Sequence, residues 1–200
     1  MIRSFVIGNG TSRSGQPVEN LVQHGTVYAC NYASVELPCD HGIAVDRSVI
    51  FDLLSQHKPK CCLWSRQKWC SVLDHSTPVY ALPEQLYKPV VRWDLAQHWS
   101  SGTYAVWKAA NDGSDIVVML GFDLWNNGTN NNLYANKNNY STKPVDPRCW
   151  IHQLLETFSR NPDTMFVNIQ PDGWSVPDSW NDLENFTVDN YANLWNWLKN

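Results

Sequence analysis

The sequence predicts a single α/β domain over residues 1–200: a Rossmann-like, doubly wound and mostly parallel sheet flanked by helices. Short apolar runs alternate along the chain with stretches of helical periodicity, the pattern of repeated strand–helix units. The run from Ile116 to Leu120 is apolar without interruption, as in a central parallel strand buried on both faces. Near the N-terminus, the apolar residues Phe5–Ile7 lead straight into Gly8-Asn9-Gly10, as a parallel strand enters a ligand-binding turn.

The first half of the chain is expected to build most of the strands. A strand over about residues 4–7 leads through the glycine turn into a short helix over about 18–24, which Gly25 ends as a C-terminal cap. An amphipathic helix over 48–56 follows Asp46. Four further strands are predicted over residues 26–30, 42–45, 60–64 and 78–82.

The second half contains the clearest strand–helix–strand arm. A helix of small residues is predicted from Ser100 to Ala110, ended by Gly113, and the strand over 115–120 follows it. A helix over 149–158, a strand over 165–169 and a last helix over 188–198 complete the prediction.

Two segments of the second half carry unusual compositions. The polar loop at about 124–147 is rich in asparagine, and we interpret it as a lid rather than as disorder because it follows the central strand. The C-terminal segment 172–200 is rich in tryptophan. Its aromatic rings either pack against one end of the sheet, which we favour, or form an interface with a second copy or another partner.

Composition bounds the possible partners. The formal net charge of −4 offers no electrostatic case for a nucleic-acid or membrane partner. No stretch approaches the ~20 apolar residues of a membrane span. The six cysteines lack regular spacing, and no C-x-x-C pair suggests a structural zinc site. Met1 leads directly into the first strand, so we expect no signal peptide and a cytoplasmic protein.

Polar residues follow several of the predicted strands. Because the strand-to-helix turns of a parallel sheet share its carboxyl edge, these residues should meet on one rim, together with the asparagine-rich lid. The start of the helix at Ser101, Gly102 and Thr103 should face the same rim and offers a second place for phosphate oxygens. We therefore predict a nucleotide or nucleotide-sugar site, although an ordinary glycine-rich turn remains the alternative for the first loop. The strand-end residues are Asn9, Gly10, Thr11, Ser12, Asn31, Asp46, Gly121 and Asp123.

Missing motifs narrow the chemistry. Arg13 stands where the Rossmann fingerprint has its third glycine, and Asn31 stands where an NAD site has an acid. The chain contains no Walker loop, no D-x-D motif and no G-x-S-x-G elbow. We therefore expect neither a bound metal nor a cofactor, and no serine-hydrolase chemistry.

Four segments in register resemble bacterial sialyltransferases of the Campylobacter type. Residues 6–12 are similar to their "GNGPS" loop, with Thr11 in place of proline, and residues 27–31 to their second strand, which ends in Cys-Asn. Residues 101–104 resemble their "TSGVY" helix start, and residues 118–128 their "LSGIDFYQNG" segment. The likeness runs from residue 4 to about 171, and uncharacterised phage proteins share the "GNGTSR" opening.

The resemblance implies a glycosyltransferase that binds a CMP-sugar without metal and transfers the sugar to the hydroxyl of a glycan acceptor. Tyr134 or Tyr140 would stabilise the leaving phosphate from the lid. Asp46 would contact the ribose or base, or else would only cap the following helix. The residues that match the nucleotide contacts of the family are Asn9, Ser12, Asn31, Ser101 and Gly102, with Gly121 and Asp123 at the third turn.

The chain departs from the family at the general base. The family uses a histidine before the next helix, and residues 141–148 contain none. Asp146 could accept the proton instead, or His152 if the helix begins earlier. The alternative function is a phage-encoded virion or interaction protein that keeps the fold without catalysis. A phosphotransferase related to archaeal pterin diphosphokinases is a third, weaker option.

Overall fold

In the described part of the chain the central sheet has eight strands, and all of its strand pairs are parallel. A computed structural model describes residues 1–57, 59–71, 77–85, 99–124, 132–135, 137, 139–140, 142–143 and 145–199. The strand order is β5-β4-β3-β2-β1-β6-β7-β8. The predicted Rossmann-like α/β class is confirmed, and the sheet is parallel throughout.

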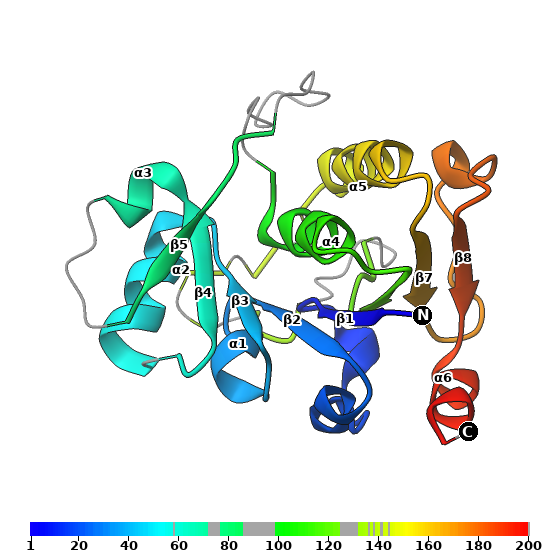
Figure 1. The fold of residues 1–200 in the computed structure, drawn as a ribbon, viewed down its shortest axis with the longest axis horizontal. Helices are drawn as coiled ribbons and strands as arrows, with labels where there is room; N and C mark the ends of the chain where they lie inside the picture. The colour runs from blue at the N-terminus through cyan, green and yellow to red at the C-terminus, as the bar shows by residue number, and fades with distance from the viewer. Residues whose placement is uncertain are drawn as a thin grey trace.

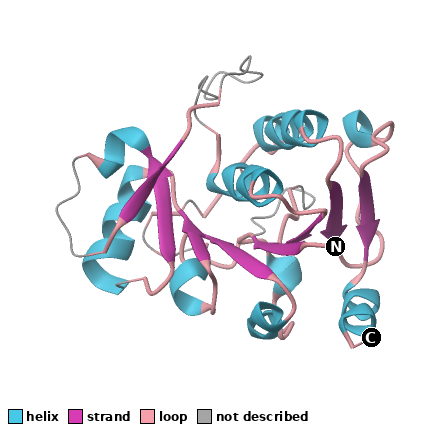
Figure 2. Cartoon of the chain, in the orientation of Figure 1, coloured by secondary structure: helices cyan, strands magenta, loops and turns pink. Residues whose placement is uncertain are grey.

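The described elements alternate along the chain as the prediction requires (Figures 1 and 2). The strands are β1 (Arg3–Ile7), β2 (Thr26–Cys30), β3 (His41–Ile43), β4 (Cys62–Arg66), β5 (Val79–Leu82), β6 (Ile116–Leu120), β7 (Met165–Ile169) and β8 (Phe186–Asp189). The α-helices are α1 (Ala33–Glu36), α2 (Arg47–Asp52), α3 (Gln67–Cys70), α4 (Ser101–Asn111), α5 (Arg148–Arg160) and α6 (Tyr191–Leu198). Short 3₁₀ turns form η1 (Thr11–Arg13), η2 (Val18–Gln23) and η4 (Asp178–Trp180), and a π-helical turn forms η3 (Leu53–His57).

Helices cover both faces of the sheet. Side chains alternate along a strand, so Val6 of β1 faces α4 and α5, whereas Phe5 and Ile7 face η2 and α6. Figure 1 shows α4 and α5 on one side of the sheet and α1 and α6 on the other. On each face of the sheet the strand residues pack into a core cluster of buried and mostly aliphatic or aromatic side chains, which explains the uninterrupted apolar run of β6.

The strand order reverses at β1. From β1 the chain builds β2 to β5 outward in one direction, and then returns through α4 to place β6 on the other side of β1. In open α/β sheets, such a reversal leaves a crevice outside the carboxyl ends of the two central strands. Here those ends carry Gly8-Asn9-Gly10 and Gly121-Phe122-Asp123.

Two differences from the predicted elements concern short segments. Residues 186–189 form β8, paired with β7 from Phe166↔Phe186 to Ile169↔Asp189, so a helix beginning at residue 188 is wrong at its start. The helix itself begins at Tyr191, after the Asn190 side chain accepts a hydrogen bond from the Asn193 amide as an N-terminal cap. The four-residue helices α1 and α3 were not predicted, because they are too short to show a helical period.

Most of the C-terminal tryptophans pack inside the chain. Trp180 is 1% exposed and donates to the Ile151 carbonyl, and the indole of Trp174 donates to the Asp123 carbonyl at 2.9 Å. Trp195 donates to the side chain of Gln16 at 2.8 Å. Trp197 is exposed and stacks under the Arg3 guanidinium. The packing interpretation therefore accounts for three of the four rings.

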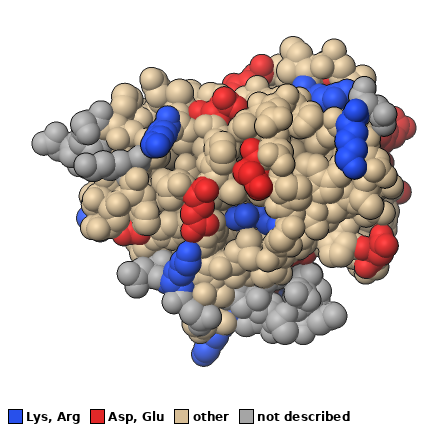
Figure 3. All heavy atoms as spheres, turned by 90° about the horizontal axis from the view of Figure 1, so that it is seen from below, with Lys and Arg blue, Asp and Glu red and all other residues tan. Residues whose placement is uncertain are grey.

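The surface in Figure 3 mixes both signs of charge. Acidic and basic side chains are interspersed on this face, and the described residues form no continuous basic patch there. None of the helices in the described part of the chain is long and apolar enough to cross a membrane.

Candidate functional site

The turns after β1 and β6 run side by side at the carboxyl edge of the sheet. The Gly8 amide donates to the Leu120 carbonyl and the Gly10 amide to the Gly121 carbonyl, each at 2.8 Å. A Cβ atom on Gly8 would lie 2.5 Å from the Gly121 oxygen, and one on Gly10 would lie 2.1 Å from the Asp123 carboxylate. The two glycines are therefore required for the close contact between these turns.

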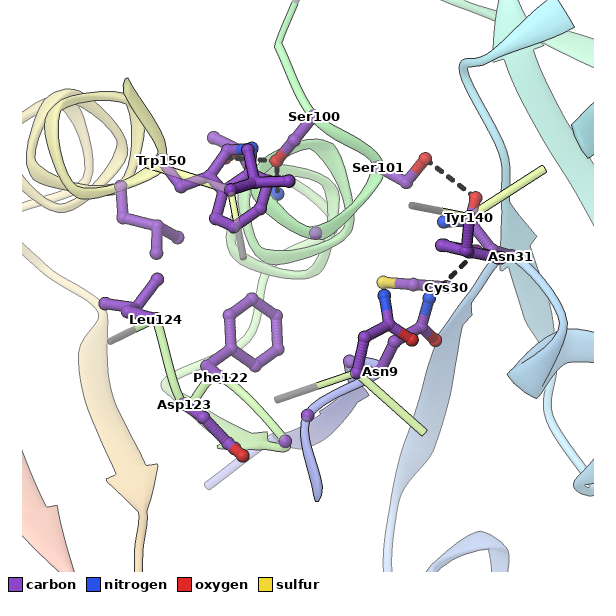
Figure 4. Close-up of a pocket in the computed structure, with 18 of the residues that line it drawn as sticks. Asn9, Cys30, Asn31, Ser100, Ser101, Phe122, Asp123, Leu124, Tyr140 and Trp150 are labelled. Atoms are coloured by element: carbon purple, nitrogen blue, oxygen red, sulfur yellow. Dashed lines mark hydrogen bonds between the residues drawn. The ribbon is translucent and has the colours of Figure 1, made fainter. Parts of the chain in front are cut away.

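A pocket of about 340 Å³ opens at this edge, as Figure 4 shows. Its polar wall comes from the turns after β1 and β2 and from the lid residue Tyr140. Its apolar wall comes from the turn after β6 and from α5. The volume falls within the range of small-molecule sites. The lining residues are Gly8, Asn9, Gly10, Cys30, Asn31, Asp46, Ser100, Ser101, Gly102, Thr103, Gly121, Phe122, Asp123, Leu124, Asn132, Asn139, Tyr140, Val145, Trp150 and Leu154.

Asn9 carries the clearest sign of an unmet interaction. Its side-chain amide donates to the Tyr140 hydroxyl at 3.0 Å, and its backbone carbonyl accepts from the Leu133 amide at 2.8 Å. Its side-chain oxygen Oδ1 is buried and has no hydrogen-bond partner among the residues that the structure describes. A buried carbonyl oxygen without a donor costs roughly 1–3 kcal/mol, so an N–H or O–H group of a ligand would relieve that cost.

Asn31 and Ser101 form a clamp across three turns of the rim. Asn31 follows β2 with a φ of 52°, a left-handed conformation that asparagine tolerates better than most residues. Its Oδ1 accepts from the Ser101 hydroxyl at 2.9 Å, and that hydroxyl accepts from the Val45 amide at 3.1 Å. The Ser101 hydroxyl is thus engaged within the protein, which leaves the Ser101 backbone amide to face a ligand.

The N-terminus of α4 points its first amides at the pocket. Ser100 caps the helix, since its hydroxyl accepts from the Thr103 amide at 3.1 Å. The side-chain oxygen of Gln153 on α5 accepts from the Ser100 amide at 2.9 Å and from the Thr103 hydroxyl at 3.2 Å. Helix geometry leaves the amides of Ser101 and Gly102 without intrahelical acceptors, at the positive end of the helix dipole. This end of α4 therefore suits an anionic group.

Asp123 lines the pocket, but its carboxylate is held from the opposite side. It accepts from the Thr11 hydroxyl at 3.2 Å, from the Ser12 amide at 2.9 Å and from the Ser12 hydroxyl. Thr11 and Ser12 therefore lie outside the pocket lining. Instead of contacting a ligand, they orient Asp123 and join η1 to the turn after β6.

The two tyrosines of the predicted lid have different positions. Tyr140 lines the pocket, and its hydroxyl accepts from the side-chain amide of Asn9 at 3.0 Å. Burial raises the pKa of Tyr140 well above its usual value, so it stays protonated and can donate to a ligand. Tyr134 points away from the pocket and bonds to Glu36 and Arg13. Burial and the bond to Glu36 also raise the pKa of Tyr134.

The two candidate carboxylates of the sequence also separate. Asp146 lies outside the pocket lining and forms a two-oxygen ion pair with Arg148, two residues along the chain. Hydrogen bonds from Arg148 lower the pKa of Asp146, which makes it a weaker base. Asp46 lines the pocket at the N-cap position of α2, yet its side chain makes no capping hydrogen bond. Of the two roles left open for Asp46, the structure therefore shows no capping of α2.

The charge of the pocket wall is negative. Among the described residues that line it, two are carboxylates and none is lysine or arginine. The buried cation Arg13 is 7% exposed and lies behind the first turn, where it donates to the Gly8 carbonyl at 2.7 Å. Burial raises the pKa of the Cys30 thiol on the pocket wall to about 12, so it stays neutral. An anionic ligand group would depend on backbone amides and hydroxyls rather than on a direct ion pair.

The structure brings together ten of the predicted site residues and leaves four outside the lining. The ten are Asn9, Gly10, Asn31, Asp46, Ser101, Gly102, Thr103, Gly121, Asp123 and Tyr140. The four outside are Thr11, Ser12, Tyr134 and Asp146. Of the predicted lid, residues 125–131, 136, 138, 141 and 144 lie outside the described part of the chain.

Sequence reasoning missed the apolar wall. Phe122 and Leu124 follow β6, while Trp150 and Leu154 stand one turn apart on α5. An available signal was their spacing of four residues, which puts two apolar side chains on the same helix face. The second omission is Gln153, which is 1% exposed and holds the start of α4. A buried glutamine bonded to another helix leaves no trace in periodicity.

The arrangement can hold a molecule that is polar along one side and apolar along the other. Amide and carboxylate oxygens on the polar wall suit the N–H and O–H groups of a base or sugar, and the α4 amides suit a phosphate. The described residues include no cluster of three or more His, Cys, Asp or Glu side chains that could hold a metal ion. Comparison with protein-family models, with curated proteins and with solved structures finds no match to this chain.

Proposed function

We propose that this protein binds a nucleotide or a CMP-sugar and transfers the sugar to an acceptor hydroxyl, in the manner of a metal-independent glycosyltransferase. The nucleoside lies between the amide wall of Asn9 and Asn31 and the apolar wall of Phe122 and Trp150. Its phosphate is bound by the first amides of α4. This is the function that the bacterial sialyltransferase resemblance implies for the same positions.

The observation that carries the proposal is the unpartnered Oδ1 of Asn9 beside this pocket. Its neighbours Tyr140 and Asn31 already bond to Asn9 and to Ser101, and a ligand donor would complete the wall. The location strengthens the argument, because the crevice at a reversal of strand order is where open α/β sheets bind nucleotides.

The transfer step needs few groups of the protein. The acceptor oxygen forms a bond to the anomeric carbon of the sugar and releases its proton to solvent water, the bond from that carbon to the phosphate oxygen breaks, and the phosphate keeps the electron pair. Tyr140, which remains protonated, donates to the leaving phosphate. Asp46 accepts hydrogen bonds from the ribose hydroxyls.

Binding is tested by thermal unfolding with CMP, CDP, UDP and GDP, each with and without Mg²⁺. A ligand at 100 times its Kd adds ~2.7 kcal/mol of stability. For a chain of this size, that corresponds to a rise in Tm of roughly 5–10 °C. We expect CMP to raise Tm equally in both conditions. If no nucleotide moves Tm, the proposed function is wrong.

Variants of the amide wall assign the effect to the pocket. Asn9→Ala removes the unpartnered acceptor, so the Kd for CMP should rise about tenfold, equivalent to ~1.4 kcal/mol. The matched control is Asn20→Ala, because Asn20 is an exposed asparagine on η2 away from the pocket. An equal loss of affinity in both variants, measured by calorimetry, would contradict the placement of the ligand.

A second candidate function is a binding or virion-associated protein that keeps this pocket without catalysis. It is favoured by the ion pair that occupies Asp146 and by the lack of histidine among the described lining residues. Incubation with CMP-sialic acid, with and without lactose as the acceptor, separates the two. Release of CMP that depends on lactose supports the transferase, whereas CMP binding without any turnover supports the binding protein.

A further inference from the structure

Two cysteines lie together at the edge of the sheet opposite the pocket. Cys39 comes just before β3 and Cys61 just before β4, and these neighbouring strands pair from His41↔Cys62 onward. The Cys62 amide donates to the Asp40 carbonyl at 3.0 Å, which extends the hydrogen bonding of the two strands by one residue toward Cys39. By this register Cys61 stands opposite Asp40, so Cys39 and Cys61 are offset by one residue across two strands that lie ~4.8 Å apart.

The two sulfur atoms also share their surroundings. Each thiol donates to the same acceptor, the carbonyl of Ser34 on α1, at 3.7 Å. The two thiols are also close enough that each perturbs the pKa of the other. Gly42 leaves the space that Cys61 occupies, since a Cβ at that position would lie 3.0 Å from its sulfur. Both side chains are only partly buried, so a small oxidant can approach them.

We propose that Cys39 and Cys61 are a redox-active pair that forms a reversible intramolecular disulfide between the amino ends of β3 and β4. This site is distinct from the nucleotide pocket, and the inference does not rest on the proposed function.

The chemistry is thiol–disulfide exchange with a low-molecular-weight disulfide such as oxidised glutathione. The Cys61 thiolate attacks one glutathione sulfur, breaking the glutathione S–S bond and releasing one glutathione thiolate. Cys39 gives its proton to that thiolate and attacks the Cys61 sulfur, so the mixed disulfide breaks and a second glutathione leaves. The two protein thiols are oxidised, and one glutathione disulfide is reduced to two thiols.

The order of attack follows from the surroundings of the two thiols. The neighbouring Cys39 thiol and the backbone amides of Cys61 and Gly42 lower the pKa of the Cys61 thiol. The neighbouring Cys61 thiol and burial raise the pKa of Cys39. Cys61 is therefore the attacking thiol and Cys39 the resolving one.

The test treats the full chain with oxidised glutathione and follows intact mass and Tm. We expect a product that has lost two hydrogen atoms and carries no glutathione, with peptide mapping that links Cys39 to Cys61. Closing the loop between them should raise Tm by about 10 °C, and dithiothreitol should reverse the change.

Three serine variants make the assignment. In the Cys39→Ser variant the reaction should stop at a glutathione adduct on Cys61. The Cys61→Ser variant should give no linked product. The matched control Cys62→Ser removes the exposed neighbour of Cys61 and should behave as the unaltered chain does. The proposal is overturned if the unaltered chain retains glutathione on Cys61, or if Cys62→Ser abolishes the link.

Discussion

Replacing Gly10 with alanine tests whether the turns after β1 and β6 must touch. The added Cβ would lie 2.1 Å from Asp123 Oδ1 and 2.6 Å from the Gly121 carbonyl oxygen, so both must move. Moving the carboxylate breaks at least one charge-assisted bond from Thr11 or Ser12, which costs about 1.5–3 kcal/mol. Moving the carbonyl weakens the bond from the Gly10 amide, worth about 1 kcal/mol.

We therefore expect Gly10→Ala to lower the free energy of unfolding by about 3 kcal/mol and Tm by roughly 6–12 °C. Urea unfolding measures this loss of stability, provided that the m-value of the variant is unchanged. The control is Gly15→Ala, which has a φ of +73° and no atom within 4 Å, so it costs only the ~1–2 kcal/mol of a left-handed backbone. If Gly10→Ala is no less stable than Gly15→Ala, the contact is not the reason for the glycine.

Three further substitutions test other parts of the site and sheet. Gln153→Leu leaves the Ser100 amide without its acceptor, so urea unfolding should show a loss of about 2 kcal/mol in stability. A loss below about 0.5 kcal/mol would contradict the role of this glutamine. Burial lowers the pKa of His41, whose ring accepts from the Trp64 indole, so the stability that the neutral ring provides should be present above pH ~6.5 and fall as the pH drops below it. His41→Gln should therefore reduce the difference in unfolding free energy between pH 7.5 and pH 5.5. An equal difference in the variant and the unaltered chain would refute the assignment. Asp146→Asn should leave the Kd for CMP unchanged in calorimetry, because the carboxylate lies outside the pocket. A tenfold loss of affinity would show instead that Asp146 contributes to the site.

The strands and their order of appearance were predictable because burial on both faces leaves an apolar run. The β2 and β7 segments, Thr26–Cys30 and Met165–Ile169, have the predicted bounds. The strand β8 was not recognised, because its short alternating pattern, Phe-Thr-Val-Asp, runs into the amphipathic α6 with only Asn190 between them.

Much of the candidate site followed from topology alone. Parallel strands deliver their following turns to one edge, and this is why Asn9, Asn31 and Asp123 come together from distant parts of the chain. Their chemical roles did not follow. Whether a side chain faces a ligand or another residue depends on single hydrogen bonds, such as those that Ser12 makes to Asp123.

The lid shows the same limit. Tyr134 and Tyr140 were equivalent in the sequence, and only the path of the loop decides that one faces Glu36 and the other the pocket. Asp146 is engaged by a cation two residues away, a local competition that neither resemblance nor residue type reveals. Such contacts depend on side-chain conformations, which hydrophobic patterns do not encode.

Because β1 lies between the two directions in which the sheet is built, the pocket at its carboxyl end lies between two halves of the sheet. Residues 3–82 build the sheet from β1 outward on one side, and residues 116–189 build it on the other. A ligand that touches both Asn31 and Leu124 holds the halves together and opposes their separation. A ligand bound in the pocket should therefore slow hydrogen exchange at the amides that join β1 to β6, because it makes opening between the two halves of the sheet less frequent.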